Sequence, residues 1–284
     1  MKLMKLNLLI LAMLMEKLII IKLVHGKDIR SNVMVELALY INEKCGKKMV
    51  ERLAETYVHI YIDEVQDMAG YDLNIIETLM KSDVAITCVG DNKQATFRTN
   101  NSVKNKKMSG TYIWTFFQKM INDKNVLMNK NLVSRRFNRE ICNFANLVYP
   151  NENNISTSMN EITEHDGVFL IKKEDVELYY DYYAPAILKY DRKTATDNYY
   201  SYNFGECKGM TFQRVLIYPN GPFLDFLLRR KKLNSPQKYY VAVTRAKYSI
   251  AFVVEILPEN KDWLLKENLK IRDRMIEIMR YRTV

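Results

Sequence analysis

The feature that most constrains the fold is residues 58–67, where an apolar, β-branched run ends abruptly in acidic and amide side chains. Residues 58–62 read Val-His-Ile-Tyr-Ile, and Asp63, Glu64, Gln66 and Asp67 follow directly. An apolar run of this length is typical of a buried strand in a parallel sheet. Ligands of open α/β sheets bind at the carboxyl ends of the strands, so we expect Asp63 and Glu64 at the mouth of a site.

Two adjacent carboxylates at such a position can take different roles. One can hold Mg²⁺, usually through water, because this cation prefers oxygen ligands and keeps part of its hydration shell. The other can orient or deprotonate a water that attacks a phosphoryl group. The alternative is a strand followed by an acidic, solvated turn, and a bare Asp-Glu pair favours it. The density of polar groups after the strand, together with the rest of the chain, favours a site.

Composition points to a globular protein with an anionic partner. The chain has 284 residues, enough for two domains with real cores, and 48% of them are hydrophobic. The net charge of +10 favours a polyanion such as nucleic acid as a partner. The four cysteines are scattered without a CxxC pair, which excludes a disulfide framework and fits a reducing cytoplasm.

The first residues permit several interpretations. Residues 6–15 form an apolar run behind Lys2 and Lys5, which resembles a signal peptide, but Glu16 and Lys17 interrupt it and no small-residue cleavage site follows. No uninterrupted stretch reaches the ~20 residues that a membrane-spanning helix needs. We interpret residues 1–24 as an amphipathic or buried helix, or as the poorly matched end of a truncated gene, with a cleaved signal as the alternative.

The first half of the chain predicts a βαβ unit. Helices are expected over residues 31–43 and 48–56, a strand over 58–62, a helix capped by Asp72, and a second buried strand over 84–89 that ends in the polar loop 90–94. Lys104, Lys106 and Lys107 form a basic patch, which is either a solvated loop or a phosphate contact. The aromatic residues of the following helix are expected in the core.

The second half repeats the α/β pattern. The expected elements are an edge strand or crossover over 126–133, a helix over 139–147, a loop over 151–166, strands over 168–171, 199–204, 215–218 and 249–254, helices over 175–190 and 236–246, and a charged helical tail from residue 258.

Five polar boxes at the ends of these elements carry a family resemblance. Carboxylates, glutamines and separated arginines are the groups that phosphoryl transfer uses. With these boxes, from about residue 32 to about residue 254, the chain resembles the UvrD/Rep-type superfamily 1 helicases. The boxes are Asp-Glu-Val-Gln-Asp at 63–67 (Walker B, motif II), Val-Gly-Asp-Asn-Lys-Gln at 89–94 (motif III), Ser-Arg-Arg at 134–136 (motif IV), residues 206–217 (motif V) and Tyr-Val-Ala-Val-Thr-Arg-Ala at 240–246 (motif VI).

The resemblance implies an α/β fold of two RecA-like parallel-sheet lobes of a P-loop NTPase helicase, the first lobe incomplete. Lobe 1 would span residues 31–132 and lobe 2 residues 133–257, with ATP between them. An uncertain segment, 1–30, would precede them, and the helical tail, 258–284, would follow.

The resemblance also implies ATP and Mg²⁺ as cofactors and a role for each box residue. Asp63 would bind Mg²⁺, Glu64 would activate water, and Gln94 would sense the γ-phosphate and couple it to DNA. Gly209 would lie near the nucleotide, and Arg136 and Arg245 would reach the γ-phosphate. An alternative for Arg245 is a cation at a helix C-terminus, worth only ~0.3–1 kcal/mol. The Thr-Arg-Ala context favours an arginine finger.

Three features depart from the family pattern. The sequence has no G-x-x-x-x-G-K-S/T loop, whose backbone N–H groups cradle phosphates; this suggests truncation at the amino end. Thr211 stands where motif V usually carries Glu, which puts a ribose contact in doubt. Motifs IV and V lie close together, which indicates a compact helicase. This short form resembles helicases paired with nucleases in anti-phage defence, such as the Gabija helicase subunit.

The predicted function is therefore ATP-dependent translocation on single-stranded or partly duplex DNA with 3′-to-5′ unwinding, impaired in the isolated chain. The alternative is a non-hydrolysing module that binds DNA or a nuclease. The predicted partners are DNA and either a nuclease subunit or a missing amino-terminal helicase half, in the cytoplasm and away from membranes. The predicted DNA-binding residues are Phe97, Arg98, Lys104, Lys106 and Lys107.

Overall fold

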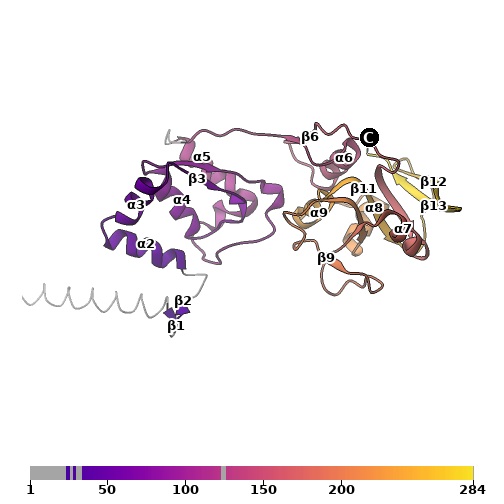
Figure 1. Cartoon of the computed structure of the whole chain (residues 1–284), viewed down its shortest axis with the longest axis horizontal. Helices are drawn as coiled ribbons and strands as arrows, with labels where there is room; N and C mark the ends of the chain where they lie inside the picture. Colours follow the sequence, from indigo (N-terminus) through magenta and orange to yellow (C-terminus); the bar gives the residue numbers. More distant parts are fainter. Residues whose placement is uncertain (1–23, 26–27, 30–33, 123–125, 284) are drawn as a thin grey trace, which may run out of the picture. The chain divides into compact units, whose positions relative to one another are not determined.

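The computed structural model describes residues 24–25, 28–29, 34–122 and 126–283 (Figure 1). The chain divides into two compact units, Met1–Met128 and Asn129–Val284. The interpretation of residues 1–23 lies outside the described residues. Val24 falls in a two-stranded antiparallel ribbon, β1 (Val24–His25) and β2 (Asp28–Ile29).

The first unit contains the predicted βαβ arrangement. Strands β3 (His59–Ile62) and β4 (Ala85–Cys88) pair in parallel, with Ile62 opposite Cys88, and α4 (Asp72–Met80) connects them. This confirms the βαβ prediction. Among its described residues, the other helices are α2 (Met34–Lys44), α3 (Lys48–Thr56), α5 (Ile113–Asn122) and the short 3-10 turns η2 (Val65–Asp67), η3 (Asn92–Gln94), η4 (Lys106–Met108) and η5 (Gly110–Tyr112).

The prediction that both strands are buried is wrong. Tyr61 is 74% exposed and Val89, just after β4, is 55% exposed. Along β3, exposed and half-buried residues alternate, because only one face of this ribbon packs on a core. Ile62 packs against the buried cluster that α4 and α5 form around Leu73, Ile76 and Phe116. The other face carries His59 and Tyr61, whose rings stack 4.2 Å apart.

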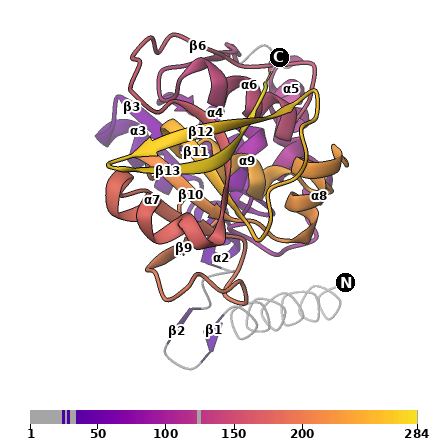
Figure 2. The same cartoon turned by 90° about the vertical axis from the view of Figure 1, so that its right-hand side faces the viewer.

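The second unit is built on a seven-stranded sheet in the order β12-β13-β7-β11-β10-β8-β9 (Figure 2). The five strands from β7 to β9 run in parallel, and the hairpin β12–β13 joins β7 antiparallel. This mostly parallel sheet in a mixed α/β chain agrees with the predicted fold class. The strands are β7 (Gly167–Lys172), β8 (Ala186–Lys189), β9 (Ser201–Asn203), β10 (Phe212–Tyr218), β11 (Ala246–Val254), β12 (Leu264–Ile271) and β13 (Arg274–Tyr281).

Helices cover both faces of this sheet. One buried cluster joins the sheet to α6 (Arg139–Val148), α8 (Gly221–Arg229) and α9 (Gln237–Val243). A second cluster joins the opposite face to α7 (Val176–Tyr183) through Val176 and Tyr179. The remaining small elements are the parallel pair β5 (Val133–Ser134) and β6 (Ser156–Thr157) and the turn η6 (Lys173–Asp175).

Two expectations for the second unit are wrong, and one helix was not expected. The tail from residue 258 is not helical; it forms the hairpin β12–β13, because alternate residues of these strands face the core. The helix expected over 175–190 ends at Tyr183, where Ala184 adopts a left-handed conformation with φ 44°, and residues 186–189 become strand β8, between β10 and the edge strand β9. Helix α8, begun by an Asn220 cap with Pro222 in its first turn, was not predicted.

Candidate functional site

The predicted acidic residues lie where two parallel strands end. The amide of Val89 donates to the carbonyl of Ile62 over 2.8 Å, and the amide of Val65 donates back to the carbonyl of Val89 over 3.0 Å. These bonds extend the β3–β4 ladder past its last pair. The loops that begin at Asp63 and at Gly90 are therefore held side by side, as the sheet-edge argument predicts.

A chain of hydrogen bonds connects these two loops. The side-chain amide of Gln66 donates to the Glu64 carboxylate, and its oxygen accepts from the Asp91 amide over 3.0 Å. The side-chain amide of Gln94 donates to the Asp91 carboxylate over 3.0 Å. Glu64 and Gln94, both predicted site residues, are thus linked through Gln66 and Asp91, which sequence reasoning did not place in the site.

Gln66 is fully buried, and its side chain occupies space that is available because residue 90 is a glycine without a side chain. A Cβ atom at residue 90 would lie 2.5 Å from the Gln66 side-chain oxygen and 2.8 Å from a methyl of Val65. No larger residue fits without displacing one of them. The sequence signal for this packing is the Gln three residues after Asp63 together with the Gly that follows the second strand.

The backbone at Glu64 is unusual for a residue with a side chain. Glu64 adopts a left-handed conformation with φ 52° and ψ 36°, and its amide donates to the Asp63 carboxylate over 2.7 Å. Such conformations cost energy and are found at functional sites more often than elsewhere. The Asp63 residue is exposed to solvent, and Glu64 is half-buried.

Thr99 anchors the loop that follows Gln94 to Asp67 and Asp72. The Thr99 amide donates to the Asp67 carbonyl over 2.9 Å, and its hydroxyl donates to the Asp72 carboxylate. The preceding Phe97 is 64% exposed and Arg98 is also exposed. These two predicted DNA-binding residues therefore project from an anchored loop, within the same unit as Glu64 and Gln94.

The basic patch is also exposed. Lys104, Lys106 and Lys107 have exposed side chains, and the Lys104 ammonium lies 4.5 Å from the centre of the Tyr71 ring. Asn105 anchors the patch by donating to the Gly70 carbonyl over 2.9 Å. The three ammonium groups are therefore accessible to solvent and to a phosphate.

The second unit brings its own three predicted residues together. The Arg136 guanidinium donates to the Thr244 carbonyl over 3.4 Å. The neighbouring Arg245 donates to the Met210 carbonyl over 3.3 Å, directly after Gly209. Gly209 has φ 81°, a conformation that favours glycine. Motifs predicted from positions more than a hundred residues apart thus meet at one loop.

Arg245 is only 1% exposed, unlike a cation at a helix end in water. Besides Met210, its guanidinium donates to the Val241 carbonyl over 3.0 Å and to the Thr244 hydroxyl over 3.1 Å. Through these contacts the Arg245 side chain connects the end of α9 to the loop at Met210. A γ-phosphate contact stays a prediction.

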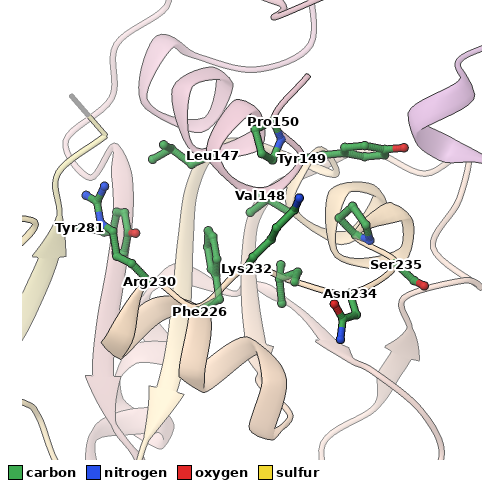
Figure 3. A pocket seen from close by; sticks show the side chains of 12 residues that line it. Leu147, Val148, Tyr149, Pro150, Phe226, Arg230, Lys232, Asn234, Ser235 and Tyr281 are labelled. Carbon is green, nitrogen blue, oxygen red and sulfur yellow. The ribbon is translucent and has the colours of Figure 1, made fainter. Parts of the chain in front are cut away.

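Two hollows lie elsewhere in the second unit. One, of about 710 Å³, is formed where α6 and α8 end and where α9 begins, and its lining does not include Arg136, Gly209 or Arg245 (Figure 3). It was not anticipated from the sequence.

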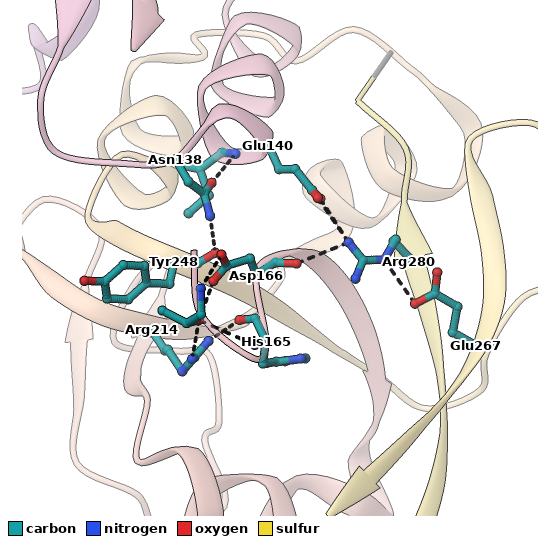
Figure 4. Close-up of polar contacts among 10 residues, drawn as sticks. Asn138, Glu140, His165, Asp166, Arg214, Tyr248, Glu267 and Arg280 are labelled. Carbon is teal, nitrogen blue, oxygen red and sulfur yellow. Dashed lines mark hydrogen bonds and ion pairs between the residues drawn. The ribbon is translucent and has the colours of Figure 1, made fainter. Parts of the chain in front are cut away.

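Asn138 is another residue that sequence reasoning missed. Its side-chain oxygen caps α6 by accepting from the Ile141 amide over 3.1 Å, and its amide donates to the Tyr248 carbonyl over 2.7 Å (Figure 4). Through these two bonds Asn138, which lies two residues after Arg136, attaches the start of α6 to β11, the strand that follows Arg245. An Asn directly before a helical pattern is a recognisable capping signal.

An ion-pair network supports the same end of α6 (Figure 4). Arg280, from β13, bonds the Glu140 carboxylate over 3.1 and 3.2 Å and that of Glu267 over 3.0 Å. Burial raises the pKa of Glu140, and Arg280 opposes that shift. The C-terminal hairpin is thereby tied to the helix that follows Arg136.

The residues at the end of β3 fit a hydrated Mg²⁺ ion. An exposed Asp63 carboxylate beside Glu64 is the donor set that Mg²⁺ takes when phosphates and water complete its shell. Among the described residues, no group of three or more His, Cys, Asp or Glu side chains could hold a metal ion alone.

Comparison with protein families gives one match, in the first part of the chain. Residues 9–109 match the family model of the UvrD/REP helicase N-terminal domain, so this part of the chain is similar to that domain. The match covers residues 63–67, the loop after β4 with Gln94, and the basic patch. A comparison with curated proteins found no significant match.

Solved structures show weaker likeness. A structure of the PRRSV helicase is 17% identical over 76% of this chain and 41% of its own, with a TM-score of 0.40. A complex of arterivirus nonstructural protein 10 (helicase) with DNA is 18% identical over 69% of this chain and 39% of its own, with a TM-score of 0.44. The chain spans about two fifths of the length of these proteins. None of the described helices is long and apolar enough to cross a membrane.

Proposed function

We propose that this chain binds a magnesium nucleotide at the carboxyl ends of β3 and β4 and couples that binding to single-stranded DNA. The observation that carries the proposal is the hydrogen-bonded chain from Glu64 through Gln66 and Asp91 to Gln94. It links the acid suited to orienting water with a glutamine three residues before the exposed Phe97. A change at either end is expected to alter the other.

Each residue of the site has a proposed role. Asp63 would hold Mg²⁺, which supplies charge neutralisation to the phosphates when bound. Glu64 would orient the attacking water and accept its proton. Gln94 would respond to the nucleotide and pass the change to the loop that Thr99 anchors. The contacts of Arg136, Gly209 and Arg245 with a nucleotide remain predictions from the family resemblance.

A phosphate-binding loop is missing from this arrangement. The 284 residues contain no G-x-x-x-x-G-K-S/T sequence, so the backbone N–H cradle and the lysine that it supplies are not provided. We therefore expect weak or no ATP hydrolysis by this chain alone. This observation also favours the second candidate function, a non-hydrolysing module that binds DNA or a nuclease. The 3′-to-5′ direction, the nuclease partner and the anti-phage role remain predictions.

The test measures Mg²⁺-dependent binding of a fluorescent ATP analogue and ATP turnover, each with and without single-stranded DNA. We expect Asp63→Asn to weaken Mg²⁺-dependent binding at least tenfold, and Glu64→Gln to retain binding while removing any turnover. Asp83→Asn is the matched control, because Asp83 is exposed and precedes β4, at the opposite end of the strands.

The outcomes separate the candidates. Turnover restored by an added polypeptide with a phosphate-binding loop would indicate one half of a divided helicase. Nucleotide binding without turnover in both conditions would support the non-hydrolysing module. Nucleotide binding equal in Asp63→Asn, Asp83→Asn and the parent chain would refute the proposed site.

A further inference from the structure

The hollow of about 710 Å³ in the second unit has mostly apolar walls (Figure 3). Three segments form it: the end of α6 with the residues that follow it, the end of α8, and the loop that leads into α9. Phe226 and Leu233 in its lining are buried, and Leu147 and Tyr149 are half-buried. Binding pockets in proteins are commonly of about 300–1,000 Å³ and lined mainly by apolar side chains. We call this hollow the α6–α8 pocket.

The α6–α8 pocket carries positive charge that the protein does not neutralise. Arg230 and Lys232 line it, and its lining includes no Asp or Glu. Their sequence neighbours Arg229 and Lys231 instead bind the Asp225 carboxylate, over 2.9 and 2.8 Å. Among the described residues, no carboxylate forms an ion pair with Arg230 or Lys232. Two cations at the pocket are therefore available to an anion from outside the chain.

The loop between α8 and α9 gives the pocket a fixed rim. Arg230 and Ser235, near the two ends of this loop, both adopt left-handed conformations, with φ 55° and 54°. The Arg230 guanidinium lies 4.9 Å from the centre of the Trp263 ring, and Leu233 anchors the loop in the core. Since the rim is already ordered, less conformational entropy is lost when a ligand binds to it.

The same loop offers backbone hydrogen-bond donors. Within the described part of the chain, the amides of residues 232–235 donate no hydrogen bond. The exposed side chains of Asn234 and Ser235 add further polar groups to the lining. A peptide can use both features, because its carbonyls accept from backbone amides while one of its side chains enters a pocket. A small carboxylate would use the cations but would leave most of these amides to water.

We propose that the α6–α8 pocket binds a peptide segment of an acidic partner protein. One large apolar side chain of the segment enters the pocket, and flanking carboxylates pair with Arg230 and Lys232. Charge favours such a partner over a second copy of this chain, because copies with a formal net charge of +10 repel one another. The proposal does not rest on nucleotide binding, since the pocket lining includes none of the residues proposed to bind the nucleotide.

The experiment begins with a display library of random peptides about twelve residues long, selected on the full chain. Peptides that bind the Arg230→Gln/Lys232→Gln variant are removed first. The matched control is Arg229→Gln/Lys231→Gln, which changes the two neighbouring cations that do not line the pocket. Both variants lower the formal net charge of +10 by two. Fluorescence anisotropy then measures the affinity of the most enriched peptide, and circular dichroism checks that each variant folds.

We expect the selected peptides to combine a large apolar residue with flanking carboxylates. The enriched peptide should bind the test variant at least fivefold more weakly than the control, the size expected for two partly exposed ion pairs. Lys232→Gln alone, which leaves the packing of Arg230 intact, should account for about half of this loss on a logarithmic scale. Replacing the apolar residue of the peptide by serine should weaken binding at least tenfold. Asp63→Asn should bind the peptide as the parent does, which separates this result from the nucleotide site.

Several outcomes would overturn the proposal. A selection that yields no peptide dependent on the two cations, or only peptides without carboxylates, would do so. Equal loss in the test and control variants would show that net charge alone attracts the peptide. Displacement of the peptide by an oligothymidylate at a lower concentration than by the unlabelled peptide would indicate a nucleic acid. Self-association in light scattering that the test variant abolishes would identify a second copy as the occupant.

Discussion

Replacing Gly90 by alanine tests whether Gln66 and Gly90 are packed as closely as the geometry indicates. The new methyl would lie 2.5 Å from the Gln66 oxygen, 2.8 Å from Val65 and 3.3 Å from the Gln66 amide nitrogen, so the Gln66 side chain must move. Its displacement breaks the bond from the Asp91 amide. Overpacking costs about 1–3 kcal/mol and a lost hydrogen bond about 0.5–1.5, which gives about 2–4 kcal/mol for Gly90→Ala.

Urea unfolding followed by tryptophan fluorescence measures this cost in the first unit. The chain has two tryptophans, Trp114 in α5 and Trp263 in the second unit, so a Trp263→Phe background leaves Trp114 as the reporter. A midpoint shift of about 1–2 M in urea is expected, since unfolding of small domains has a slope of about 1–3 kcal/mol per molar. Gly205→Ala is the control, because a Cβ there meets no atom within 4 Å.

A double-mutant cycle tests whether the close contact with Gln66 causes the loss of stability in Gly90→Ala. In a Gln66→Ala background the methyl at residue 90 has fewer atoms to displace, so the penalty of Gly90→Ala should fall well below its value in the parent chain. The contact with Val65 would keep it above zero. Strictly additive penalties would refute the reasoning, as would a Gly90→Ala variant as stable as the Gly205→Ala control.

Three further predictions concern the second unit. Asn138→Ala should lower the free energy of unfolding by about 1–3 kcal/mol, because it removes a helix cap and the bond to the Tyr248 carbonyl; chemical denaturation measures the loss, and an unchanged value would contradict the capping role. Arg245→Lys should destabilise more than Arg136→Lys in the same assay, because lysine cannot reach the three acceptors that buried Arg245 serves. Burial lowers the pKa of His165 to about 3. Between about pH 6.5 and pH 3 the unfolded chain therefore binds a proton that the folded chain does not. The free energy of unfolding should decrease as the pH is lowered through this range, by up to about 1.4 kcal/mol per pH unit. His165→Asn should flatten that acid-side slope in thermal melts at successive pH values, and an unaltered slope would assign it to other groups.

Local patterns sufficed for much of the fold and for the candidate site's outline. The apolar runs around Ile60 and Ile86 identified two parallel strands, and the polar residues after them identified one edge. The connection through Gln66 and Asp91 could not be predicted, because it depends on a register that sets Ile62 against Cys88. Likewise, no local signal distinguishes a buried Arg245 from a cation at an exposed helix end, since its acceptor at Met210 lies 35 residues away in the sequence.

The errors arose where composition and period disagreed. Residues 264–281 are rich in Leu, Lys, Glu, Met and Arg, which favour helices. Their burial nevertheless alternates, and Arg272 turns the chain with φ 53°. The sheet in the second unit decides the outcome, because Ile278, Met279 and Arg280 find partners along β7. The exposure of Tyr61 is a similar case, since an apolar run does not reveal how many faces of a strand will be covered.

The position of the C-terminal hairpin has a consequence for solubility. Strand β7 is buried at five of its six positions, and without β13 its outer backbone amides and carbonyls would face solvent. An apolar strand with such an edge is a template for pairing between molecules. The hairpin replaces it with β12, along which Lys266, Asn268 and Lys270 are exposed. Charged residues at the outermost edge disfavour addition of a further strand, so the end of the chain protects the sheet against aggregation.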